Sequence, residues 1–121
     1  MSTTENLRFL FKGIEVDQKT RDYIEKRLTS LDKKFMEEVT HTEVEVDLDK
    51  KGKFRVEVMI RTPRNLFRSE NITESIEASI DLSVDELEDQ IIHQKDKVRT
   101  IRKRGAVSLK KKLVVDEAAR F

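Results

Sequence analysis

The 121-residue sequence has no cysteine and no tryptophan, and only one proline, one tyrosine and three glycines. Without cysteine, the chain has neither a disulfide framework nor thiol chemistry. No apolar run approaches the length of a membrane span. The first residues lack the basic segment and apolar stretch that mark a signal peptide. We therefore expect a soluble, cytoplasmic protein that has no membrane partner.

Charge is abundant but balanced, with 40% charged residues and a formal net charge of +1. The hydrophobic residues, 36% of the chain, recur periodically, which favours a thin two-layer core over disorder. A chain of this length forms about one domain. We place a single α+β domain at residues 1–104 and a basic C-terminal tail at residues 105–121. The net charge does not indicate nucleic acid, so any such argument depends on where the charges lie.

Alternating apolar residues predict four strands. They are Leu7–Lys12, Thr40–Asp49, Phe54–Arg61 and Leu66–Glu70. Lys50-Lys51-Gly52 is typical of a three-residue hairpin loop with glycine in the left-handed position. Such a loop pairs Asp47 with Arg55 across the ladder, which is favourable. It also places Glu45 opposite Glu57, which is a local cost.

Helical spacing predicts two amphipathic helices. The first begins after Asp17 and runs to about Phe35, and the second runs from Asn71 to Lys103 with Thr73 as its cap and Gly105 at its end. The order is then β-α-β-β-β-α, with a parallel pair between the first and second strands. We expect a four-stranded sheet with both helices packed on one face. The apolar stripe of the second helix comprises Ile76, Ile80, Val84, Leu87, Ile91, Val98 and Ile101.

Signals for catalysis are poor. His93 follows Asp89 by four residues, but no third ligand is evident, so the pair is interpreted as solvated. The alternating acids Glu43 to Asp49 on the second strand are typical of a solvated face with edge protection. We expect no enzymatic activity, no metal, no cofactor and no small-molecule substrate.

Basic residues give the stronger signal, because they gather at the end of the second helix, on the outer face of the first, and around the hairpin and turn. Three clusters on a small domain suit binding to the backbone of structured RNA. With Tyr23 as the only tyrosine, stacking on single strands is disfavoured. The candidate RNA-binding residues, each a phosphate contact, are Lys26, Arg27, Lys33, Arg68, Lys95, Lys97, Arg99, Arg102 and Lys103.

Four segments carry a resemblance to a known family. Residues 14–33 resemble its first helix, Phe54–Val58 its third strand, Leu66–Glu70 its fourth strand and Ala78–Ile91 its second helix. The family is that of the ribosome hibernation-promoting factors and ribosome-associated inhibitors, and the likeness runs from about Leu7 to Arg104. This chain resembles the short form, because it ends before the dimerisation domain of the long members.

The resemblance implies a fold akin to double-stranded-RNA-binding domains. It also implies binding to rRNA of the small ribosomal subunit, in the channel for mRNA and tRNA. Members block translation under stress by occupancy, and no bond is made or broken. The sequence departs from the family pattern at Glu86 and Asp89, where members carry basic residues, and at Glu77, where an aromatic residue is common.

A second hypothesis remains open. The acidic face of the second helix could act as a protein-interaction regulatory module that meets a basic partner. Competition by RNA separates the two hypotheses, whereas salt screens both. In either case we expect a monomer off the ribosome. The residues of this acidic face are Asp81, Asp85, Glu86 and Asp89.

Overall fold

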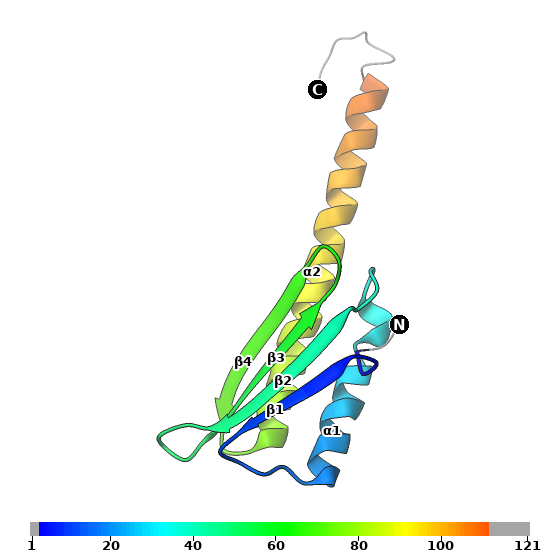
Figure 1. The fold of residues 1–121 in the computed structure, drawn as a ribbon. Coiled ribbons are helices and arrows are strands. Elements are labelled where there is room, and N and C mark those ends of the chain that lie inside the picture. Colours follow the sequence, from blue (N-terminus) through cyan, green and yellow to red (C-terminus); the bar gives the residue numbers. More distant parts are fainter. Residues whose placement is uncertain (1–2, 112–121) are drawn as a thin grey trace. The chain divides into compact units, whose positions relative to one another are not determined.

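The computed structural model describes residues 3–111, with side chains described for residues 3–97. The elements are β1 (Leu7–Lys12), α1 (Gln18–Thr29), a short 3-10 helix η1 (Asp32–Lys34), β2 (His41–Leu48), β3 (Phe54–Arg61), β4 (Leu66–Thr73) and α2 (Ile76–Lys111) (Figure 1). This order confirms the predicted α+β fold. The chain divides into two units, Met1–Ile91 and Ile92–Phe121, and each is described by itself.

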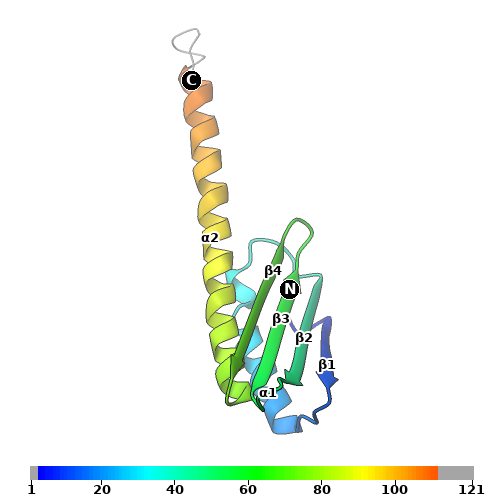
Figure 2. The ribbon, with the colours of Figure 1, turned by 90° about the vertical axis from the view of Figure 1, so that its left-hand side faces the viewer.

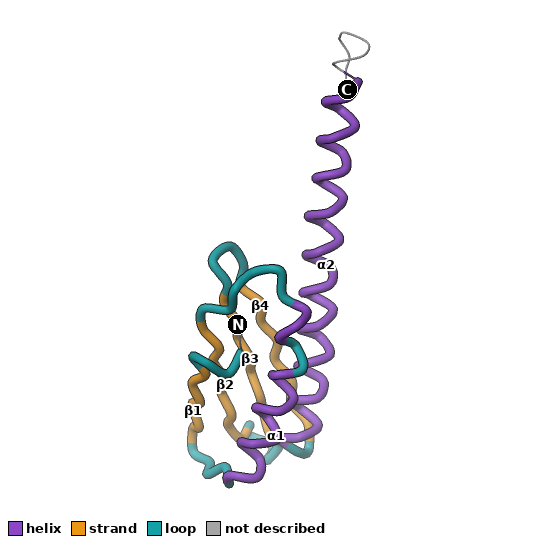
Figure 3. Tube along the Cα trace, turned by 90° about the vertical axis from the view of Figure 1, so that its right-hand side faces the viewer, coloured by secondary structure: helices purple, strands orange, loops and turns teal. Residues whose placement is uncertain are grey.

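The four strands form one sheet in the order β1-β2-β3-β4. β1 pairs with β2 in parallel, and the other two pairs are antiparallel. In the first unit, α1 and the beginning of α2 cover the same face of the sheet (Figures 2 and 3). The opposite face, which we call the open face, carries no helix in that unit. Both the parallel crossover and the one-sided helix layer confirm the sequence-based expectation.

The core lies between the sheet and the two helices. Alternate residues of β2 and β3 point into it, and Val44, Val58 and Ile60 are fully buried. Ile24 of α1 and Ile80 of α2 are equally buried from the helical side. Burial of side chains of this size contributes roughly 1.5–3 kcal/mol each, so this layer supplies most of the stabilisation of the fold.

The hairpin between β2 and β3 forms as predicted. Gly52 has a φ of +81°, a conformation that glycine adopts without steric cost. The Asp49 amide donates to the Lys53 carbonyl at 2.8 Å, and the Asp49 carboxylate accepts from the amides of Lys51 and Lys53. The alternation along the second predicted strand places Leu48 on the core side with Val44 and Val46, but this expectation is wrong, because Leu48 is exposed at the strand end.

The start of α2 differs from the prediction. Asn71 to Thr73 continue β4, because they pair with Val56, Arg55 and Phe54 of β3. The helix begins at Ile76, and the hydroxyl of Ser75 accepts from the Ala78 amide at 3.0 Å. Ser75 therefore caps the helix in place of Thr73.

Two helix ends also differ from the prediction. α1 begins after Asp17, whose carboxylate accepts from the Thr20 amide at 2.9 Å. It ends at Thr29 instead of Phe35, and Leu31 and Phe35 reach the core through the separate turn of η1. α2 continues through Gly105 to Lys111, because a single glycine costs about 1 kcal/mol in a helix and the residues after it favour helix. Of the predicted tail, residues 112–121 lie outside the described part of the chain.

Candidate nucleic-acid interface

The charges divide unevenly between the two units. The first unit, residues 1–91, contains 15 lysines and arginines against 21 aspartates and glutamates, a formal net charge of −6. Residues 92–111 contain 8 basic residues and 1 acidic residue, a net charge of +7. The chain as a whole is near neutral only because these two parts cancel.

On α1, the candidate cations differ in their surroundings. Lys26 and Lys33 are exposed, and the described part of the chain gives neither an ion-pair partner. The Arg27 guanidinium instead lies against α2, where its Nε is 3.0 Å from the Asp81 carboxylate and Nη2 is 3.6 Å from Asp85. Arg27 therefore links the two helices, which makes it a weaker candidate for contacting phosphate than Lys26.

Tyr23 joins the same link. Its hydroxyl donates to the Asp81 carboxylate at 2.7 Å. That hydrogen bond to a carboxylate raises the pKa of Tyr23, because ionisation would place two negative charges together. A tyrosine held in this way on α1 is not free to stack on RNA bases.

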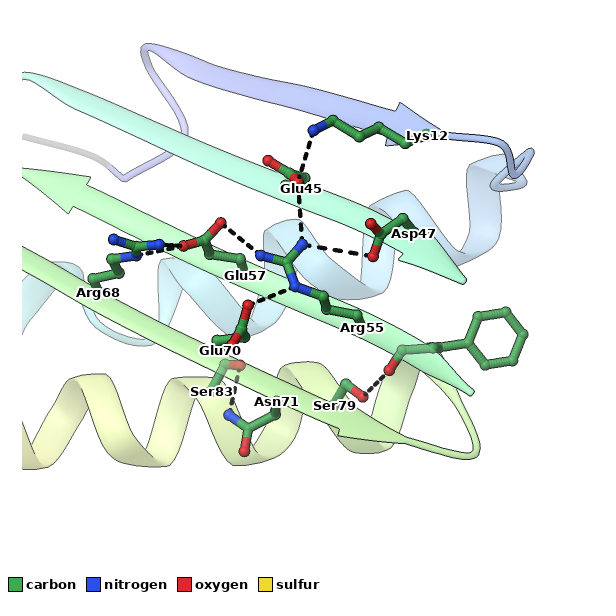
Figure 4. Close-up of polar contacts among 11 residues, drawn as sticks. Lys12, Glu45, Asp47, Arg55, Glu57, Arg68, Glu70, Asn71, Ser79 and Ser83 are labelled. Atoms are coloured by element: carbon green, nitrogen blue, oxygen red, sulfur yellow. Dashed lines mark hydrogen bonds and ion pairs between the residues drawn. The ribbon is translucent and has the colours of Figure 1, made fainter. Parts of the chain in front are cut away.

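Arg68 lies on the open face of β4, with most of its side chain exposed. Its guanidinium forms an ion pair with Glu57 of β3 (Figure 4). Its backbone amide donates to the Gln90 side chain of α2 at 3.2 Å, and its carbonyl accepts from the same side chain at 2.7 Å. Position 68 thus ties β4 to α2, and Arg68 meets phosphate only by leaving or sharing Glu57.

Arg55 is the centre of a charge network on the open face. Its guanidinium lies 3.1 Å from carboxylate oxygens of Glu45 and Glu57, 3.5 Å from Asp47, and in contact with Glu70 (Figure 4). The predicted Asp47–Arg55 pair is confirmed. The predicted repulsion between Glu45 and Glu57 is offset by the same guanidinium.

The pKa values follow from this network. Burial lowers the pKa of Arg55, but hydrogen bonds to Glu70 and Glu45 raise it by more, so it stays charged. Burial raises the pKa of Glu45, but hydrogen bonds from Lys12 and Arg55 lower it by more. These charges are matched within the protein, so this part of the open face offers little to an external polyanion.

The basic part of α2 contains the remaining candidates. Lys95 is half-exposed and Lys97 is exposed. Arg99, Arg102 and Lys103 lie in the same helix, and their side chains are outside the described residues. Their role in RNA binding stays a prediction, as does that of the other candidates.

The acidic face of α2 is divided among different partners. Asp81 and Asp85 pair with Arg27 on the α1 side. Glu86 turns to β4, where its carboxylate accepts from Ser69 and Asn71. The four acids therefore do not form one uncommitted patch, and the structure offers little support for a basic protein partner.

Among the described residues, no group of three or more potential ligands is placed to hold a metal ion.

One cluster is absent from the sequence-based candidates. A pocket of about 250 Å³ opens where β1 begins, and it is lined by Asn6, Arg8, His41, Thr42, Glu43, Met59 and Arg61. Arg8, His41 and Arg61 are not among the predicted RNA-binding residues. Their proximity depends on the register of three strands, which the alternating pattern does not reveal.

No helix within the described residues is long and apolar enough to cross a membrane.

Comparison with known proteins gives the class of this fold. The structure is similar to the N-terminal domain of Protein Y from Thermus thermophilus, with a TM-score of 0.64 and 32% identity over 75% of this chain and 96% of that one. It is also similar in fold to a ribosomal subunit interface protein from Coxiella burnetii, with a TM-score of 0.65 and 17% identity over 75% of this chain and 98% of that one.

Family membership follows from the sequence match. The family described as Sigma 54 modulation protein / S30EA ribosomal protein matches residues 7–99. The chain belongs to this family of ribosome-associated proteins, which confirms the resemblance noted in its helices and strands. The match contains both helices as far as Arg99, and so includes the start of the basic segment.

Proposed function

We propose that this protein inhibits translation by occupying the mRNA and tRNA channel of the small ribosomal subunit. Membership of a family of ribosome-associated proteins supports the proposal. Occupancy needs no catalysis, so no bond is made or broken and no cofactor takes part. The protein would act in the cytoplasm, where the ribosomes are.

The observation that carries the proposal is the concentration of positive charge in residues 92–111. Eight basic residues against a single acid give this helical segment a field that attracts RNA phosphates. Neutralisation of phosphates releases bound counterions, so affinity gained in this way falls steeply with salt. The segment is therefore suited to rRNA, the polyanion that lines the channel.

The first unit would supply the bulk that blocks the channel. The open-face acids around Arg55 and Arg68 are matched by these two arginines, and the net charge of −6 in this unit opposes non-specific adhesion to RNA. A folded domain with satisfied charges excludes mRNA sterically without binding every phosphate nearby. Exposed cations such as Lys26 and Lys33 would orient this unit against rRNA.

Co-sedimentation with purified small subunits tests the proposal. We expect the protein to pellet with subunits at low salt, to dissociate steeply as salt rises, and to be displaced by mRNA and tRNA together. Displacement by these ligands locates the site, whereas salt dependence alone does not. Binding that persists unchanged in saturating mRNA and tRNA would place the protein elsewhere on the subunit.

A further inference from the structure

The pocket at the start of β1 is surrounded by charges that have no partner. Arg8, Glu43 and Arg61 line it, and the charged group of each has no ion pair or hydrogen bond with any residue that the structure describes. Farther along the same face, Lys12, Arg55 and the acids around them are all paired (Figure 4). Matched charges are thus the rule on this face, and the pocket is the exception.

The strand register brings these side chains together. Arg8 of β1 lies opposite Glu43 of β2, and Arg61 of β3 lies opposite His41 of β2. From the usual strand spacing and rise, the Cα atoms of Arg8 and Arg61 are about 12 Å apart. Two arginines at this separation, on either side of a glutamate, can hold a planar ligand between them.

The pocket offers both apolar and polar contacts. Met59 supplies a polarisable apolar surface. Glu43 supplies carboxylate oxygens on the same side of the sheet. The amide nitrogen of Asn6 donates to the Thr40 carbonyl at 3.0 Å, which fixes the orientation of that side chain. A purely anionic ligand would be repelled by Glu43, so the ligand needs donors as well as negative charge.

We propose that this pocket binds one unpaired guanine nucleotide. One of the two arginines contacts the phosphate, and the other stacks on the base. Guanine presents two adjacent donors on its Watson–Crick edge, and a carboxylate such as that of Glu43 has two acceptor oxygens to receive them. Uracil presents a single donor between two acceptors, which a carboxylate repels.

This inference rests on the proposed function only for the source of the nucleotide. An unpaired guanine of an RNA loop and a free guanosine monophosphate present the same chemistry to the pocket. Recognition of such bases usually combines stacking with hydrogen bonds to the base edge. Here arginine would take the place of the aromatic platform, which agrees with the scarcity of exposed aromatic side chains.

Amide chemical-shift titration of the full chain tests the inference. We expect GMP to shift the amides of Arg8, His41, Glu43 and Arg61. UMP, guanosine and inorganic phosphate should each bind at least about tenfold more weakly than GMP, because each lacks hydrogen bonds that GMP makes. Phosphate binding as tight as that of GMP would overturn base recognition. The absence of shifts at these amides with GMP would overturn the site itself.

Three variants give the test its controls. Arg61→Gln should weaken GMP binding by about tenfold, and Glu43→Gln should remove the preference for GMP over UMP. Arg64→Gln makes the same change of charge nearby, at a side chain that does not line the pocket, and should bind GMP like the wild type. Equal GMP affinity in Arg61→Gln and the wild type would contradict the proposal.

Subunit co-sedimentation separates this inference from the proposed function. A wild-type chain that binds GMP but not subunits would leave the pocket standing and refute ribosomal binding. A chain that binds subunits but shows no response to GMP would refute the nucleotide pocket and leave ribosomal binding standing. To distinguish the two sources, an RNA hairpin with guanine in its loop is compared with GMP, and we expect the hairpin to bind more tightly through its additional phosphates.

Discussion

Glu45 of β2 and Glu57 of β3 lie directly opposite each other in the antiparallel ladder, and the Arg55 guanidinium contacts both at 3.1 Å. Like charges in this arrangement are destabilising. The guanidinium turns the repulsive pair into part of a network. The open face can therefore hold a dense row of acids without a loss of stability.

Removal of this guanidinium should destabilise the fold. We expect Arg55→Met to lower the free energy of unfolding by about 2–3 kcal/mol at pH 7, less than for a fully buried pair because the network is partly solvated. Urea unfolding followed by circular dichroism measures the change. Lys12→Met, which removes a more exposed partner of Glu45, serves as the control and should cost less than about 1 kcal/mol.

The effect of Arg55→Met should depend on pH. The lowered pKa of Glu45 means that its contribution to stability is present above its ordinary value of 4.5 and is lost as the pH falls through the folded-state pKa. In the variant the part of this contribution that comes from Arg55 is missing, while Lys12 still contacts Glu45, so the difference from the wild type should shrink below about pH 4.5. A difference in stability that stays constant from pH 7 to pH 3 would show that the network does not stabilise through charge.

A buried charge in the core should unfold the protein. Ile80 is fully buried, while Leu82, two residues along α2, is 46% exposed. An unpaired carboxylate in the core costs several kcal/mol, which is comparable with the stability of a small domain. Thermal melts should show no cooperative transition for Ile80→Asp and a nearly wild-type transition for Leu82→Asp. Equal melting temperatures for the two variants would contradict the assigned face of α2.

Adjacent cations on α1 should have different effects. Arg27→Ala breaks the contacts with Asp81 and Asp85, and should cost about 0.5–1 kcal/mol of stability because the pairs are partly exposed. Lys26→Ala should leave stability unchanged and weaken binding to small subunits. Urea unfolding and co-sedimentation are measured on both variants. The reverse assignment, with binding lost only in Arg27→Ala, would mean that Arg27 leaves Asp81 to bind RNA.

Most of the fold could be predicted from the sequence, because its signals are local. The alternation of apolar residues predicted both ends of β3 correctly. Gly52 predicted the hairpin, because a glycine in the left-handed position defines the loop, and the loop sets the register of β2 and β3. Less local features were wrong. The end of β4 at Thr73 depends on pairing with Phe54, and the helix after Gly105 continues although glycine often ends one.

The candidate site was less predictable, because exposure and pairing depend on packing. Lys26 and Arg27 are adjacent and carry the same charge, yet only Arg27 reaches α2. Arg8 and Arg61 are far apart in sequence and share a pocket only through the register of β1, β2 and β3. The division of the acidic face between α1 and β4 likewise requires the positions of both neighbours.

The proposal that the basic segment of α2 binds rRNA is tested most directly by reversing three of its charges. The variant Lys97→Glu, Arg99→Glu, Arg102→Glu removes three potential phosphate contacts and adds repulsion. Surface changes of this kind cost about 0.5 kcal/mol each or less, and the helix dipole adds little because all three positions lie more than one turn before the end of α2 at Lys111. Circular dichroism checks folding, and reversal of the exposed hairpin residues Lys50, Lys51 and Lys53 is the matched control.

The decisive measurement is co-sedimentation of this triple variant with small subunits, alongside inhibition of translation in vitro. We predict that the folded α2 variant loses subunit binding by orders of magnitude, with a flatter salt dependence, and no longer inhibits translation, while the hairpin variant behaves like the wild type. A folded α2 variant that binds and inhibits like the wild type would contradict the account.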